Sequence, residues 1–378
     1  MKKYVRYLLV LLMCGFLTEV KAQTTFQVDG INYYLDGSEA RVSDNQYYSG
    51  SKIIIPNSVL YDGKNYPVTS IADSAFYSNW SLIEVTIPNS VTTIGDYAFA
   101  SCSGLKTVTI PNSVTTIGDY VFASCSGLKT VTIPNAMTSI GRNAFYGCTG
   151  LTEVTIPNAV TSIGINAFYG CTGLTEVTIP NSVTTIGERA FYRCTGLQTV
   201  IWNARNAEYY NGLSYDSPFS NCDRLTDFVF GEEVEHIPAY LCRELTLLNT
   251  IVIPNSVTSI GTNAFSFCRG LTKVSIPNSV KTIEFRAFEG CTGLKTVTIG
   301  NSVTTIGESA FYSCTSLTEV SIPNSVTSIG SSVFEDCSGL KTVTIGNSVT
   351  TIGESAFHCC IYNHRTTKTN QKYPSVNL

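Results

Sequence analysis

The sequence predicts a mainly β solenoid of about 13 stacked coils with very little helix. Three observations predict this fold class: one unit recurs every 23 residues, each unit contains a short strand-like alternation, and no stretch keeps a helical period over ten residues. A chain of 378 residues would ordinarily suggest two or three domains. A fixed period of this size indicates one array instead, in which each coil buries its apolar side against its neighbours.

The unit that begins at Leu105 reads L-K-T-V-T-I-P-N-S-V-T-T-I-G-D-Y-V-F-A-S-C. Val108 points inward between two outward threonines, as in a strand with one buried face. Pro111 ends this strand because proline has no N–H to donate to a ladder. A second short extended side follows, and Gly118 makes the next corner. We expect one short helical or 3₁₀ turn after this corner, carrying the inward Phe122.

The array can be followed by the last inward residue of each first strand. All intervals between these residues are 23 residues except two, which are 32 residues after Ile55 and 28 residues after Trp202. The second exception predicts a five-residue insertion in one coil. The thirteen positions are Ile55, Ile87, Ile110, Ile133, Ile156, Ile179, Trp202, Phe230, Ile253, Ile276, Ile299, Ile322 and Ile345.

The N-terminus has the three parts of an export signal. Lysines and an arginine precede an apolar run of about 11 residues, too short to span a bilayer, and Ala22 ends a small-residue cleavage pattern. We therefore expect residues 1–22 to be a cleaved signal peptide. The alternative is a lipoprotein signal with Cys14 as the lipidated residue. No other long apolar run exists, so we expect no membrane insertion of the mature chain.

Both ends of the array differ from the repeat. Residues 23–66 are expected to form an N-terminal cap, with hairpin turns at Asp29-Gly30 and Asp62-Gly63. The repeats are expected over residues 67–361, with the first strand already at 53–55. Residues 362–378 are polar and aperiodic, which predicts a tail outside the array.

Composition excludes several function classes. The formal net charge is −4, so there is no basic surplus to neutralise the phosphates of a nucleic acid. No nucleophile elbow, dinucleotide fingerprint or phosphate-binding loop is present, so we expect no catalytic residue and no cofactor. His236 takes the place of an outward threonine and is interpreted as an exposed substitution.

Most cysteines occupy one position of the repeat, together with Asn79. Stacked equivalents lie about 4.8 Å apart in parallel coils, beyond the ~3.5–4.5 Å between Cβ atoms of a disulfide. We interpret the column as a structural ladder of buried free thiols, whereas a disulfide framework is the alternative that export would permit. No metal site is expected, because His358-Cys359-Cys360 with His364 lacks zinc-ligand spacing. The ladder is Asn79, Cys102, Cys125, Cys148, Cys171, Cys194, Cys222, Cys268, Cys291, Cys314, Cys337 and Cys360.

The repeat resembles the BspA-type leucine-rich repeats, through L-x-x-V-x-I-P-N-S-V-T-x-I-G-x-x-A-F-x-x-C at period 23. The resemblance covers residues ~53 to 360 and implies a right-handed leucine-rich-repeat solenoid in a secreted or cell-surface protein. It also implies adhesion to host matrix proteins such as fibronectin and fibrinogen, or to other bacteria. It supplies no catalytic residues.

Tyrosines mark the candidate binding region. Tyr146, Tyr169 and Tyr192 follow the core Phe in three consecutive units, and the insertion adds Tyr209, Tyr210 and Tyr215. Exposed aromatic side chains suit protein or sugar recognition. The alternative is that these tyrosines only cover the coil edge, and the outward Thr face is a second candidate surface.

The sequence therefore predicts a non-catalytic, adhesin-like protein that binds macromolecules outside the cell. Its expected partners are extracellular or host matrix proteins, other cell-surface proteins or glycans. A structural spacer or surface-layer scaffold without a ligand and a glycan-acting enzyme are the alternatives.

Overall fold

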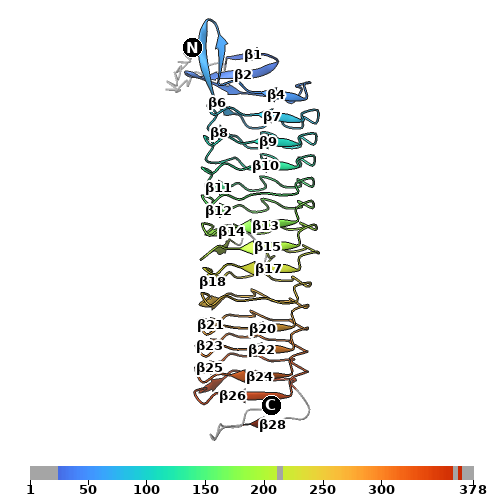
Figure 1. The fold of residues 1–378 in the computed structure, drawn as a ribbon, viewed down its shortest axis with the longest axis vertical. Helices are drawn as coiled ribbons and strands as arrows, with labels where there is room; N and C mark the ends of the chain where they lie inside the picture. The colour runs from blue at the N-terminus through green and yellow to red at the C-terminus, as the bar shows by residue number, and fades with distance from the viewer. Residues whose placement is uncertain (1–23, 211–215, 361–364, 368–378) are drawn as a thin grey trace, which may run out of the picture.

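The chain winds into a long rod of stacked coils, with the N-terminus at one end and the C-terminus at the other (Figure 1). This computed structural model describes residues 24–210, 216–360 and 365–367, so the expected signal peptide lies outside the described residues. All named elements in the described part are β-strands, which confirms the predicted mainly β solenoid. No helix in the described ranges has the length and hydrophobicity needed to span a bilayer.

The N-terminal segment folds as antiparallel hairpins, as the turn signals predict. Strands β1 (Thr25–Val28) and β2 (Ile31–Asp36) pair around Asp29 and Gly30, whose φ angles of 51° and 80° match a type I′ turn. Strand β2 also pairs with β3 (Glu39–Val42), and β5 (Ser58–Tyr61) pairs with β6 (Lys64–Ile71). Because β6 pairs in parallel with β8 (Thr93–Ile94), the hairpins join directly onto the coils.

The first side of most coils contributes a strand to the front sheets, whose neighbours are parallel and usually 23 residues apart in sequence. Residues 151–157 and 251–254, which occupy this side in two coils, form no strand. In β9, Val108 is buried between two exposed threonines, so the predicted alternation is confirmed. The front strands are β4 (Lys52–Ile54), β7 (Glu84–Thr86), β9 (Thr107–Thr109), β10 (Thr130–Thr132), β13 (Glu176–Ile179), β15 (Thr199–Trp202), β17 (Asp227–Phe230), β20 (Lys273–Ser275), β22 (Thr296–Thr298), β24 (Glu319–Ile322) and β26 (Thr342–Ile345).

The second side forms shorter parallel strands. In most coils this strand ends in a buried Ile. These are β8, β11 (Ser139–Ile140), β12 (Ser162–Ile163), β14 (Thr185–Gly187), β16 (Glu208–Tyr210), β18 (His236–Ile237), β19 (Ser259–Ile260), β21 (Thr282–Ile283), β23 (Thr305–Ile306), β25 (Ser328–Ile329) and β27 (Thr351–Ile352).

The third side is built from hydrogen-bonded turns, so the expected short helical turn is wrong. Tyr97 and Ser101 have positive φ angles of 56° and 62°, which interrupts any helical path. The N–H groups of Tyr97, Phe99 and Ser101 donate to carbonyls of the next coil, at 2.9, 2.9 and 2.6 Å. In most coils two left-handed residues thus direct alternate N–H groups toward the next coil, while the N–H groups between them, such as that of Ala100, donate within the same coil.

The core is one continuous column of inward side chains. Phenylalanines of successive coils stack with ring centroids 5.0 to 5.5 Å apart, from Phe76 to Phe219 and again from Phe265 to Phe357. Cys242 occupies the place of the missing Phe between these runs. Phe228 and Phe230 replace the usual Val and Ile there, and they contact the flanking rings edge-on. Larger neighbours therefore occupy the space that the smaller Cys242 leaves.

The cysteine column is a ladder of thiol hydrogen bonds. Each of its eleven thiols is buried, forms no disulfide with a described cysteine, and donates to a carbonyl of the preceding coil at 2.7 to 3.3 Å. Asn79 replaces cysteine where the ladder meets the cap, and its amide donates to the carbonyls of Asn45 and Tyr48. An amide has two N–H donors and can bond both carbonyls of this irregular segment, whereas a thiol has only one donor.

The expected tail contributes one further strand. Strand β28 (Arg365–Thr367) pairs in parallel with β26, with Arg365 opposite Thr342 at the repeat spacing of 23 residues. This strand was not predicted from the sequence, because residues 365–367 read Arg-Thr-Thr and include no apolar residue. Backbone groups at the edge of β26 nevertheless accept any extended partner.

We predict that Asn79→Ala lowers the free energy of unfolding by about 1–3 kcal/mol, because the carbonyls of Asn45 and Tyr48 each lose the hydrogen bond that the Asn79 amide donates. Urea unfolding followed by circular dichroism measures this loss. Asn135→Ala, at an exposed turn position, is the matched control and should change the midpoint little. Equal midpoints for the two variants would contradict the role of Asn79.

We also predict a steep loss of stability at alkaline pH. Burial raises the pKa of the ladder thiols, to about 12 for Cys102 and Cys268 and well above the ordinary value of 9.0 for Cys148. Above pH 9 the unfolded chain releases protons that the folded chain keeps, so each thiol lowers stability by about 1.4 kcal/mol per pH unit. Below the ordinary thiol pKa of 9.0, the ladder thiols are protonated in both the folded and the unfolded chain, so they do not lower the free energy of unfolding there.

Urea midpoints under reducing conditions should thus hold to about pH 8 and fall sharply between about pH 9 and 10. Cys359→Ser, which removes an exposed thiol, should leave this profile unchanged. A midpoint that stays constant to about pH 10.5 would show that the ladder thiols do not resist ionisation.

Candidate functional site

The tyrosine column, here Tyr146, Tyr169 and Tyr192, lies on the third side of three consecutive coils. Each ring directly follows a buried Phe, so the stacking of the core sets the position of the tyrosines outside it. The ring centroids lie 4.6 and 5.0 Å apart, with interplanar angles of 15° and 22°. All three side chains are partly exposed. The stack thus covers both faces of the Tyr169 ring and one face each of the Tyr146 and Tyr192 rings.

Arginines end this column beside the insertion. The guanidinium carbons of Arg189 and Arg193 lie 5.3 and 5.6 Å from the centre of the Tyr192 ring. Arg189 Nε also donates to Asp216 at 2.6 Å, and Asp216 directly follows the undescribed part of the insertion. Charge pairing therefore fixes the base of the insertion against the end of the tyrosine column.

The insertion tyrosines are only partly described. Strand β16 carries Tyr209 and Tyr210 and pairs in parallel with β14, which brings their backbone onto the second side. Their side chains and the whole of Tyr215 lie outside the described residues. The structure brings together Tyr146, Tyr169 and Tyr192 and leaves the other three candidates untested.

A second tyrosine pair was not predicted from the sequence. Tyr97 and Tyr120 stack with centroids 4.6 Å apart, at the left-handed position of two coils that precede the tyrosine column. Tyr97 is 39% exposed. The repeated Asp-Tyr dipeptide at one repeat position could have revealed this pair.

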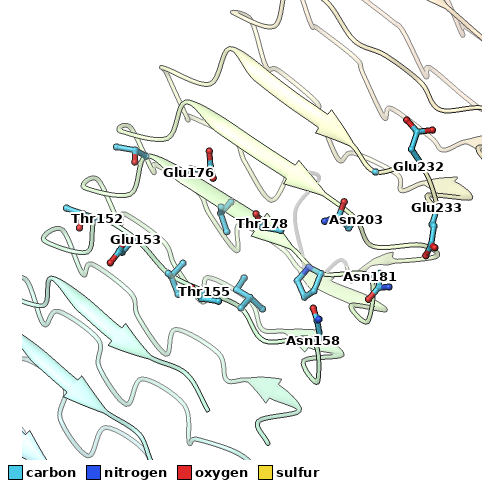
Figure 2. Close-up of a pocket in the computed structure, with 16 residues that line it drawn as sticks. Thr152, Glu153, Thr155, Asn158, Glu176, Thr178, Asn181, Asn203, Glu232 and Glu233 are labelled. Carbon is cyan, nitrogen blue, oxygen red and sulfur yellow. The ribbon is translucent and has the colours of Figure 1, made fainter. Parts of the chain in front are cut away.

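A hollow of about 1120 Å³ lies on the outer face of the front sheet, near the insertion. Figure 2 shows Glu153 and Glu176 at one side of it and Glu232 and Glu233 at the other, with asparagines and threonines between them. Here Gly231 and Asn203 replace the usual proline after the strand, and the Asn203 side chain packs against the glycine backbone. The insertion coil and its neighbour thus change the otherwise regular Thr face.

His236 differs from its expected exposed position. Its ring is half-buried between coils, and Nδ1 lies 2.7 Å from the Ser259 hydroxyl oxygen. Burial lowers the pKa of this imidazole, which keeps it neutral at pH 7. Its hydrogen-bond partner is the equivalent residue of the next coil, so it joins two coils.

The described residues contain no group of three or more His, Cys, Asp or Glu side chains arranged to hold a metal ion. His364, which the sequence places near His358, Cys359 and Cys360, lies outside the described residues. The Cys360 thiol already donates to the carbonyl of Phe334 as the last member of the ladder.

Solved structures of bacterial proteins resemble this chain. A leucine-rich repeat protein from Bacteroides ovatus is 30% identical with a TM-score of 0.64, and the match covers 89% of this chain and 92% of that chain. A leucine-rich cell surface protein from Faecalibacterium prausnitzii is also 30% identical over 89% of this chain and 92% of that chain, with a TM-score of 0.44. No curated protein matches the sequence.

The family model of the BspA-type leucine-rich repeat region matches in six copies, over residues 69–198, 138–272 and 235–364. These matches together span most of the chain and include every front strand from β7 to β26. The chain belongs to the BspA-type leucine-rich repeat family.

Proposed function

We propose that this protein is exported and binds other proteins outside the cell, as a non-catalytic adhesin whose contact surface includes the tyrosine column. The observation that carries the proposal is a stack of three partly exposed tyrosines beside the five-residue insertion. An inserted loop on a single coil is a common place for a binding function in repeat proteins. Tyrosine is also enriched among the residues that dominate binding energy at protein interfaces.

The stacking geometry favours a protein partner over a glycan. Sugars pack their C–H groups against an open aromatic face, but stacking covers both faces of the Tyr169 ring and one face each of the Tyr146 and Tyr192 rings. At the far end, the guanidinium groups of Arg189 and Arg193 lie over Tyr192. Ring edges and hydroxyls suit the backbone and side-chain groups of a protein surface. Matrix proteins of the host, such as fibronectin and fibrinogen, are the partners to test first.

The triple variant Tyr146→Ala, Tyr169→Ala, Tyr192→Ala should bind its partner at least about tenfold more weakly, because interface tyrosines often contribute more than ~1 kcal/mol each. Solid-phase binding of the mature chain to fibronectin, fibrinogen and a glycan panel, at two salt concentrations, measures the change. Tyr312→Ala is the matched control, since Tyr312 occupies the same repeat position without a stacked neighbour in its column.

The triple Phe variant at the same positions keeps the stack and removes the hydroxyls, so it should fall between wild type and the triple Ala variant. Unchanged affinity of a folded triple Ala variant would contradict the tyrosine site. Absence of binding by folded wild type to every probe would favour the spacer instead.

A further inference from the structure

The hollow on the front sheet carries a surplus of unpaired negative charge. Its four carboxylates belong to Glu153, Glu176, Glu232 and Glu233, all exposed. None of the four makes an ion pair with another described residue. The guanidinium of Arg205 lies near Glu233 but is paired with Glu235.

The charge continues along the sheet beyond the hollow. Parallel register places Glu176 beside Thr199, and Thr199 beside Asp227, so the acidic column extends toward the C-terminal coils. Elsewhere on this face the same column mixes signs, with Lys273 and Glu319 separated by a threonine. The acidic stretch is therefore local to the coils around the insertion.

An aliphatic strip runs beside the acidic column on the same face. The outward column that holds Thr155 and Thr178 in the hollow continues with Ile201, Val229 and Val252. Val229 is 50% exposed and Val252 is 79% exposed. Residues two apart on a strand face the same side about 6.6 Å apart, so the apolar strip and the carboxylates lie within reach of one extended segment.

We propose that this acidic groove, formed by the hollow and its aliphatic strip, docks an extended cationic segment of a partner protein in which Lys or Arg residues alternate with aliphatic ones. Basic side chains would pair with Glu153 and Glu176 on one side and with Glu232 on the other, while aliphatic side chains cover Val229. Charge complementarity selects this occupant, because nucleic acids and acidic glycans carry the sign of charge that the groove repels. The groove lies on a different side of the coil from the tyrosine column, so each site can fail independently.

The test uses a fluorescein-labelled ten-residue peptide alternating lysine and valine, with a glutamate–valine peptide as its counterpart. Fluorescence anisotropy with the mature wild-type chain should show saturable binding of the lysine peptide alone, weakened by added salt. The variant Glu153→Gln, Glu176→Gln, Glu232→Gln should bind it at least about tenfold more weakly, since three exposed ion pairs are lost.

The matched control removes three exposed carboxylates elsewhere, as Glu308→Gln, Glu319→Gln, Glu354→Gln, and should change the affinity less than about twofold. Val229→Thr with Val252→Thr restores the residue type of most other coils and should weaken binding about threefold through lost apolar contact. Equal weakening by the two Gln variants, or no binding by wild type, would overturn the proposal. The triple Ala variant of the tyrosine column should bind the peptide as wild type does, which separates this site from the proposed adhesin surface.

Discussion

Each coil depends on the next one for its hydrogen bonds and for its core. A single coil carries inward Leu, Val, Phe and Cys side chains, but it has no partner strand and no second layer of its own. Backbone donors such as Phe99 N–H reach acceptors in the following coil, and thiols such as Cys125 reach the preceding one. The 23-residue spacing therefore keeps every column in register, and a coil of different length must restore that register locally.

The array meets this constraint differently where its length changes. Around the insertion, Trp202, Phe228 and Phe230 replace smaller inward residues, and Cys242 replaces a phenylalanine. The core stays continuous there, while the outer face gains a hollow, an acidic column and exposed valines. The tyrosine column ends at the same coils. The coils in which core residues are replaced are thus also the coils whose outer surface differs most from the regular rows of outward threonines.

The sequence was sufficient to predict the solenoid, its period, both hairpin turns and the inward columns, because each depends on a pattern repeated many times. It could not reveal the left-handed turns of the third side, since Tyr97 and Ser101 are residue types that rarely adopt a positive φ. It also missed strand β28, which has no apolar residue, and the hollow, which arises from coils far enough apart in sequence that only their stacking joins Glu153 to Glu232. Local patterns predict a repeat well, but not the surface that its exceptions produce.

The central claim is that binding is concentrated in the coils around the insertion. Hydrogen–deuterium exchange of the mature chain, free and bound to the matrix protein that it captures, tests this claim most directly. The account predicts added protection in peptides that cover residues 146–233, with little change in the regular coils from 279 to 345. Protection spread evenly along the rod, or confined to the regular coils, would contradict it.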